Sequence, residues 1–364
     1  MAISRQTCLL LALVFVSVFA GWQGVGASYA VSAGDNPASG VSARLDAWLE
    51  DTVPPKVENS GDPAPPSDVS TAPPAQAGLD SKTQWALERI QALPVAWTAG
   101  SGSPVLVAVL DTGVDKDHED LAGRVAAEID FSGSSPDDVY GHGTPIAGII
   151  AADDSNGLGV IGLAPDSLLL NVKVADDDGK CRLSALAGGI IWAVDHGALV
   201  INVSIEMKDA SAVMEDAVDY AWSHGALVVA AAGNDGNSVR VYPAACAHSL
   251  AVTAVQPSGA LAPLANYGDW VDCAAPGLEI YAALPGDNYG YKHGTSFATA
   301  YVSGLAALLF SMASDVNGNG FLNDEVLAAI ESGCEAIALD GTGYGMINVP
   351  ASIAALAPAN ASLQ

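Results

Sequence analysis

The sequence predicts an α/β fold of three layers, in which a mostly parallel central sheet carries helices on both faces. Short β-branched runs alternate with small-residue runs of helical length, and this alternation is typical of βαβ units. Two of the helical runs close on glycine, which commonly ends a helix. The runs that indicate buried strands are 104–111, 168–174, 198–204 and 226–234, and those that indicate helices are 144–152, 184–197 and 211–225.

Composition narrows the class of protein and its partners. The chain has 364 residues, of which 50% are hydrophobic, so it can bury the core of one large domain. Its formal net charge is −28. Nucleic acid and anionic membrane surfaces repel such a chain, so we expect neither as a partner.

Residues 1–30 have the features of a signal peptide. Arg5 gives a positive start, and the apolar run 8–20 is too short to span a bilayer comfortably. Small residues follow that suit cleavage after Ala27 or Ala30. We therefore expect a protein secreted to the extracellular space or the periplasm, with no membrane contact after cleavage. An uncut signal anchor is the alternative.

The next segment differs in composition from the rest of the chain. Residues 31–79 are rich in proline, serine and alanine, which is typical of an extended leader, pro-segment or linker. A globular domain is expected over 80–358, followed by a tail at 359–364. Export would place the remaining cysteines in an oxidising compartment, which predicts two disulfides of undetermined pairing, with four free thiols as the alternative. These cysteines are Cys181, Cys246, Cys273 and Cys334.

Four polar residues fall where a site is expected. In open parallel sheets, sites form beyond the carboxyl ends of the strands. Asp111 ends one predicted strand and Asn234 ends another, while His142 and Ser296 open predicted helices facing that edge. Taken singly, each could be a turn residue or a helix cap.

Together these residue types supply the parts of a nucleophilic site. A serine hydroxyl needs an adjacent base, and the imidazole of His142 can provide one near neutral pH. Asp111 can orient that imidazole through its other ring nitrogen. The side-chain amide of Asn234 and the backbone N–H of Ser296 can donate to an oxyanion.

The residues around these four positions resemble the signature segments of the subtilases, the subtilisin-like serine proteases. The order Asp, His, Ser is also that of the family. The stretch 84–97 resembles the start of the family's catalytic domain, so the resemblance covers residues 80–358. The four segments are VAVLDTGVDKDHEDL (107–121), GHGTPIAG (141–148), AAAGNDG (230–236) and GTSFATAYVSG (294–304).

The resemblance implies a secreted serine endopeptidase that hydrolyses peptide bonds through an acyl-enzyme on Ser296. Protein or peptide substrates, no organic cofactor and a monomeric state are expected with it. One alternative is a processing peptidase of the same chemistry with a dedicated partner. A non-catalytic binding protein of the same fold is the other, and the complete set of catalytic residues argues against it.

Four residues depart from the family pattern near the predicted catalytic residues. Pro145 replaces the family's second histidine, and proline suits the first turn of a helix. Phe297, Ala300 and Tyr301 replace a methionine, a proline and a histidine that usually follow the serine. None of these changes removes a catalytic residue, so we expect an altered rate or specificity rather than inactivity.

The family binds its substrate between two chain segments that line the first side-chain pocket. The resemblance places Ser204, Ile205 and Glu206 on one segment and Ala232 and Gly233 on the other, with Val241 at the base of the pocket. Glu206 and Val241 stand where glycine is usual. A shallower pocket with negative charge at its rim predicts a preference for small or basic side chains. The alternative is that Glu206 points to solvent.

Calcium is the one cofactor that the resemblance implies. The residues matching a family site are Asp120, Asn156 and the backbone carbonyls of Leu158 and Val160, and hard oxygen ligands of this kind suit calcium. A solvated acidic loop is the alternative. A second segment, 315–326, begins like an EF-hand loop, but Glu325 falls one residue early. We favour an interhelical loop there, with Asn323 capping the next helix.

Overall fold

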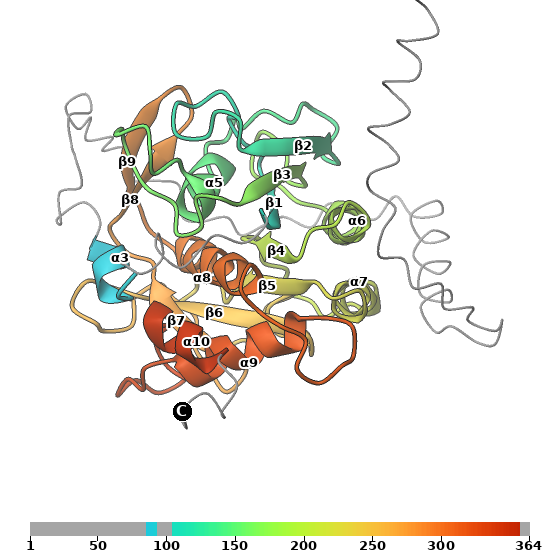
Figure 1. The fold of residues 1–364 in the computed structure, drawn as a ribbon. Helices are drawn as coiled ribbons and strands as arrows, with labels where there is room; N and C mark the ends of the chain where they lie inside the picture. Colours follow the sequence, from blue (N-terminus) through green and yellow to red (C-terminus); the bar gives the residue numbers. More distant parts are fainter. Residues whose placement is uncertain (1–84, 93–103, 357–364) are drawn as a thin grey trace, which may run out of the picture. The chain divides into compact units, whose positions relative to one another are not determined.

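The computed structural model describes residues 85–92 and 104–356, and within them it confirms the predicted α/β fold (Figure 1). A seven-stranded sheet has the order β2-β3-β1-β4-β5-β6-β7, and every neighbouring pair is parallel. A separate antiparallel hairpin follows. The strands of the sheet are β1 (Leu106–Asp111), β2 (Val125–Asp130), β3 (Leu168–Lys173), β4 (Val200–Val203), β5 (Leu227–Ala231), β6 (Ser249–Val255) and β7 (Cys273–Pro276), and those of the hairpin are β8 (Ile280–Leu284) and β9 (Asn288–Lys292).

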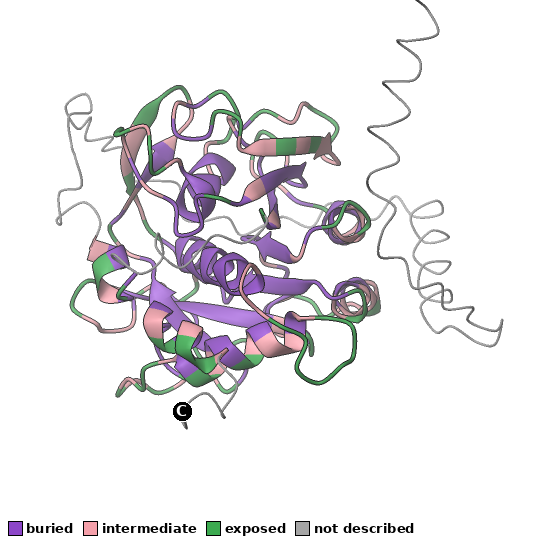
Figure 2. Cartoon of the chain, in the orientation of Figure 1, coloured by how far each residue is buried: buried purple, intermediate pink, exposed green. Residues whose placement is uncertain are grey.

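Helices cover both faces of the sheet. α5 and α8 pack on one face and α6 and α7 on the other, and α8 is buried along its whole length (Figure 2). The described helices are α3 (Trp85–Arg89), α5 (Gly143–Ala151), α6 (Leu183–Asp195), α7 (Ala212–Ser223), α8 (Thr295–Phe310), α9 (Asn323–Gly333) and α10 (Val349–Ala355).

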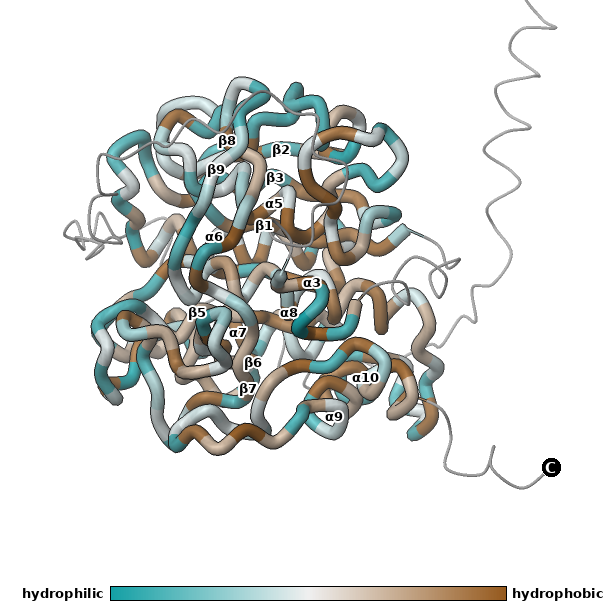
Figure 3. Tube along the Cα trace, turned by 90° about the vertical axis from the view of Figure 1, so that its left-hand side faces the viewer, coloured by the Kyte–Doolittle hydropathy of each residue, from teal (hydrophilic) through white to brown (hydrophobic). Residues whose placement is uncertain are grey.

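The alternation of side chains along each strand divides the core into two layers. Successive side chains point to opposite faces of a sheet. Val107 and Val109 of β1 therefore pack in the cluster that holds α5 and α8, whereas Ala108 and Leu110 pack in the cluster that holds α6 and α7. Loops at the outside of the chain trace are mostly hydrophilic (Figure 3). This arrangement leaves the carboxyl ends of the strands and the start of α8 to form the site.

Several strands were not predicted from the sequence. β2 lies at one edge of the sheet and alternates between half-buried and exposed residues, so it lacks a long apolar run. β7, at the other edge, has only four residues, Cys273–Pro276. These two strands form because they hydrogen-bond to β3 and β6, which their own sequences do not indicate.

The predicted pair of disulfides is absent from the structure. All four cysteines of the described chain are free thiols, with Cys181, Cys246 and Cys273 buried and Cys334 half-buried. Cys181 packs with the α6 side of the core, while Cys273 lies in the α8 layer, next to Cys334. Counting cysteines could not reveal this separation, because the sheet determines which face each thiol occupies.

Some predictions concern residues outside the described part of the chain. These are the signal peptide at 1–30, the leader at 31–79 and the tail at 359–364. In the part that is described, no helix combines the length and apolar character needed to cross a membrane.

Candidate active site

Asp111 and His142 form a close pair at the carboxyl edge of the sheet. Asp111 is the last residue of β1 and is 1% exposed, and His142 is the N-cap residue of α5. Nδ1 of His142 lies 2.8 Å from Oδ1 and 2.9 Å from Oδ2 of Asp111. A carboxylate only accepts hydrogen bonds, so Nδ1 carries the proton and Nε2 is left as the basic nitrogen. The pair therefore fixes the tautomer that a general base requires.

Glycine lets β1 and α5 approach closely enough for this contact. A Cβ on Gly143 would overlap the backbone oxygen of Gly113 and lie 3.0 Å from Cβ of Asp111. Gly113 itself has φ +109°, a conformation that side chains disfavour. Gly143 and Gly113 are thus glycines because a side chain at either position would overlap neighbouring backbone.

Asp138 holds the start of α5 in place, and sequence reasoning missed it. Its buried carboxylate accepts hydrogen bonds from the hydroxyl of Thr112 at 2.7 Å and from the backbone N–H of Gly141 at 2.8 Å. The N–H and hydroxyl of Thr144 donate to its other oxygen at 2.8 and 2.7 Å. A negative charge at a helix N-terminus also interacts favourably with the helix dipole. The acid therefore positions the turn that presents His142.

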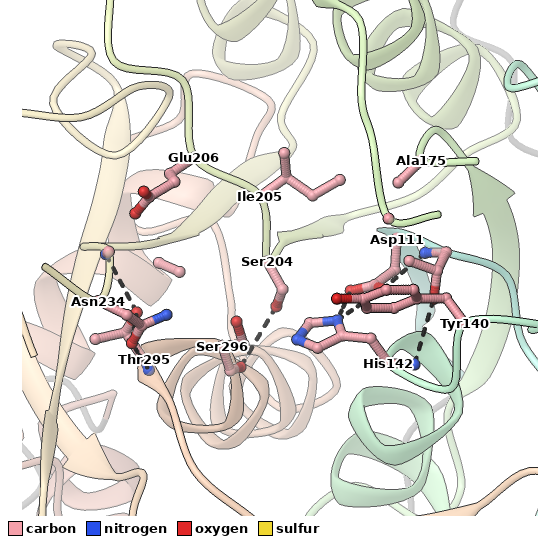
Figure 4. A pocket seen from close by; sticks show the side chains of 14 residues that line it. Asp111, Tyr140, His142, Ala175, Ser204, Ile205, Glu206, Asn234, Thr295 and Ser296 are labelled. Atoms are coloured by element: carbon pink, nitrogen blue, oxygen red, sulfur yellow. Dashed lines mark hydrogen bonds and ion pairs between the residues drawn. The ribbon is translucent and has the colours of Figure 1, made fainter. Parts of the chain in front are cut away.

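Ser296 is the second residue of α8 and is 3% exposed. Buried hydrogen bonds tie this turn to the end of β4. Ser204 Oγ donates to the backbone oxygen of Ser296 at 3.4 Å, and Asn202 Nδ2 donates to Ser204 Oγ at 3.0 Å. Figure 4 shows the His142 ring between Asp111 and Ser296. The structure thus brings the three predicted catalytic residues together from β1, α5 and α8.

The side chain of Asn234 has a defined orientation. Its Oδ1 accepts hydrogen bonds from the backbone N–H of Thr295 at 2.9 Å and from the Thr295 hydroxyl at 3.2 Å. With Oδ1 directed to these donors, the amide NH₂ points the other way, as an oxyanion donor requires. Thr295 is a second residue that sequence reasoning missed, although it immediately precedes the predicted nucleophile.

A pocket lies beside these residues and contains part of the predicted substrate-binding set. Ser204, Ile205, Glu206 and Gly233 line it, together with the predicted catalytic residues. Ala232 and Val241 do not; they are 0% and 1% exposed and pack in the core layer of α6 and α7. These two residues are thus not among the residues that line this pocket, and their role in substrate binding stays a prediction.

Glu206 does not point to solvent. Its Oε2 atom is buried, and a Cβ on Gly233 would overlap it. The side chain consequently reaches from the 204–206 segment to the 231–233 segment (Figure 4). The solvent-facing alternative is excluded by this contact.

The residues that depart from the family pattern are accommodated in the core. Pro145 and Ala300 are buried within α5 and α8. Phe297 is 1% exposed, and its ring centroid lies 5.6 Å from that of His142 with the planes tilted by 54°. Phe297 therefore adds packing on one side of the imidazole.

The predicted calcium ligands also come together. Asp120 is fully buried; its Oδ1 accepts from Asn156 Nδ2 at 2.9 Å and its Oδ2 from the backbone N–H of Val160 at 2.9 Å. The N–H of Leu158 donates to Asn156 Oδ1 at 2.9 Å. Within the described residues, no group of three or more His, Cys, Asp or Glu side chains could hold a metal ion.

The loop before α9 is stabilised by its own hydrogen bonds. Asp315 accepts from the backbone N–H groups of Gly318 and Gly320 at 2.7 and 2.9 Å. Asn323 is the first residue of α9 and donates to the backbone oxygen of Trp222, so it is not the helix cap that we predicted. The segment is the interhelical loop between α8 and α9.

Comparison with known proteins agrees with this geometry. The model of the subtilase family matches residues 102–334. The chain belongs to the subtilase family. As a subtilase it is a subtilisin-like serine endopeptidase, which confirms the resemblance in its sequence.

Three relatives illustrate how far the similarity extends. The chain is 43% identical over 258 residues to the thermophilic serine proteinase of Bacillus sp. (strain AK1). The aligned residues are 70% of this chain and 63% of that protein. It is 40% identical over 272 residues to thermitase of Thermoactinomyces vulgaris, with 74% and 95% covered. It is 43% identical over 226 residues to subtilisin BL of Lederbergia lenta, with 62% and 83% covered.

Proposed function

We propose that this subtilase is secreted and cleaves peptide bonds through an acyl-enzyme on Ser296. The observation that carries the proposal is the contact of His142 Nδ1 with both carboxylate oxygens of Asp111, at 2.8 and 2.9 Å, beside the first turn of α8. Because this contact occupies Nδ1, the other ring nitrogen, Nε2, is the one that acts as the base toward the serine. The substrates are proteins or peptides.

The proposed mechanism follows from these positions. His142 Nε2 takes the proton of the Ser296 hydroxyl as its oxygen attacks the carbonyl carbon. Charge develops on the carbonyl oxygen, where the Asn234 NH₂ and the Ser296 backbone N–H donate to it. The tetrahedral intermediate collapses to the acyl-enzyme as the imidazolium of His142 protonates the departing amine. Water, deprotonated by His142, then releases the acid and restores the serine.

A labelling experiment tests this proposal. We expect a fluorophosphonate probe to modify Ser296 in the secreted, leader-free protein, identified by mass spectrometry of the labelled peptide. Ser296→Ala serves as the control and should give no labelled peptide. Failure to label a folded wild-type protein would contradict an activated serine and favour a non-catalytic binding role.

We further propose a structural calcium ion at the Asp120 loop. The buried carboxylate and the amide of Asn156 already face each other at 2.9 Å. Turning that amide so that its oxygen replaces its nitrogen would give a set of hard oxygen ligands with the nearby backbone. Bound there, the ion would stabilise the loop after α5 by neutralising the carboxylate. A chelator should then lower the melting temperature of Ser296→Ala, and Asp120→Asn should abolish that effect; an unchanged melting temperature would count against the site.

Secretion is proposed from residues 1–30 and has its own test. N-terminal sequencing of the exported protein should begin after Ala27 or Ala30 or, if the leader is also removed, near residue 80. Recovery of the intact N-terminus in the membrane fraction would instead identify an uncut anchor. The proposed monomeric state would be checked by light scattering of the same material.

A further inference from the structure

Glu206 crosses the slot in which the family holds the first substrate side chain. It follows β4, whereas Gly233 follows β5, and the two strands are parallel neighbours in the sheet. A Cβ on Gly233 would overlap the Glu206 carboxylate, so this carboxylate lies directly over the Gly233 backbone. The carboxylate can lie there because Gly233 has no side chain. Gly233 also has φ +94°, a conformation that favours glycine.

A buried amide lies behind the carboxylate. Asn266 is fully buried, and its Oδ1 accepts from the backbone N–H groups of Asp235 at 3.0 Å and Asn237 at 3.2 Å. These bonds direct its Nδ2 away from them, toward the same point over Gly233 that Glu206 occupies. In the described residues this Nδ2 has no hydrogen-bond acceptor. Glu206 Oε2 and Asn266 Nδ2 thus both lie over Gly233, without a hydrogen bond between them.

The neighbouring acid does not supply the charge in this slot. Asp235 is ion-paired with Lys208 at 2.9 Å, and both side chains are largely exposed, at 37% and 53%. The Asp235 hydrogen bond raises the pKa of Lys208 most, and the field of Glu206 adds to it. Of the two acids, Glu206 is the one that lines the pocket.

We propose that Glu206 is a specificity-determining residue that selects lysine or arginine on the amino side of the scissile bond. This inference rests on the proposed proteolysis at Ser296 and names its substrate class. A cationic side chain entering the slot compensates the half-buried carboxylate with charge-assisted hydrogen bonds. An aromatic side chain would displace water from the carboxylate without donating a hydrogen bond to it, which is strongly unfavourable. A small apolar side chain would neither displace the water around the carboxylate nor form a favourable interaction with it.

Substrates that differ in charge but not in shape test the proposal. Two quenched-fluorescence peptides would be identical except for arginine or citrulline before the scissile bond, with phenylalanine and alanine versions added. We expect kcat/KM for arginine to exceed that for citrulline at least about 10-fold, as expected when a charged partner is lost from a desolvated site. Glu206→Gln should reduce this ratio to below about 3-fold by removing the charge and keeping the shape.

A matched control separates the slot from general surface charge. Asp209 is an exposed acid three residues further along, and Asp209→Asn should leave the arginine-to-citrulline ratio unchanged. Equal rates for the two peptides, a preference for phenylalanine or alanine, or an unchanged ratio in Glu206→Gln would each overturn the proposal.

Two further readouts keep this inference distinct from the proposed function. Fluorophosphonate labelling of Ser296 reports whether the serine is activated, whatever the pocket prefers. Binding of the same peptides to Ser296→Ala, measured by fluorescence anisotropy, reports the pocket without catalysis. Tighter binding of arginine than of citrulline supports the role of Glu206 even where labelling fails, and equal binding refutes it even where labelling succeeds.

Discussion

Replacing Asp138 with alanine should destabilise the domain and slow catalysis together. Asp138 is 6% exposed and accepts four hydrogen bonds of 2.7 to 2.8 Å from Thr112, Gly141 and Thr144. Hydrogen bonds to a charged group contribute about 1.5–3 kcal/mol each, but bonds that share one acceptor are not additive. The donors left behind would be buried without an acceptor. We therefore expect a loss of about 3–5 kcal/mol in the free energy of unfolding, because each buried donor left unsatisfied costs about 1–3 kcal/mol.

The assay is urea unfolding in a Ser296→Ala background, which prevents self-digestion. Asp137→Ala is the matched control, because its carboxylate is exposed and accepts only from the Ser135 hydroxyl at 3.0 Å. This control should change stability by less than about 0.5 kcal/mol. With Ser296 restored, Asp138→Ala should lower kcat by about 10²-fold, since a small displacement of His142 misaligns the base. A stability within about 1 kcal/mol of the parent would refute the role assigned to Asp138.

Other contacts lead to three shorter predictions. Thr295→Val should lower kcat about 10-fold, because Asn234 loses one of the two donors that orient its amide. Thr295→Ser keeps the hydroxyl and should restore kcat. Equal losses of kcat in both variants would contradict the role of the Thr295 hydroxyl. Burial raises the pKa of Asp272 to about 6, so the folded state holds its proton more tightly than the unfolded state does. Stability should therefore fall by up to about 3 kcal/mol as the pH rises from 4 to 6, and Asp272→Asn should flatten that profile in pH-dependent urea unfolding. Burial also raises the pKa of the Cys181 and Cys246 thiols, so iodoacetamide should modify them only after unfolding, as peptide mass spectrometry would show; modification of the native protein would contradict their burial.

The proximity of the predicted catalytic residues could be anticipated from the sequence because each lies where an element starts or ends. Asp111 closes an apolar run, and Ser296 opens a small-residue run. Parallel strands direct such ends to one edge, so residue type and position suffice to suggest a common site. The resemblance to the subtilases then supplied the roles.

The residues that support the site could not be predicted in the same way. Asp138 bonds to Thr112 across 26 positions, and Thr295 bonds to Asn234 across 61. Neither interaction follows a helical or strand period, so no local pattern indicates it. Asp138 lies in a polar stretch of the sequence, and such a stretch is typical of a solvent-exposed loop.

The amino-acid sequence by itself determined the fold class, the order of the predicted catalytic residues and the likeness to the subtilases, since these depend on periodicity and residue type along the chain. Tertiary structure alone decided that Glu206 enters the slot over Gly233, that Val241 faces the core, and that the cysteines are free thiols. The physical reason is that a side chain's direction and partner depend on the neighbouring strand and helix. Those neighbours come from distant parts of the chain.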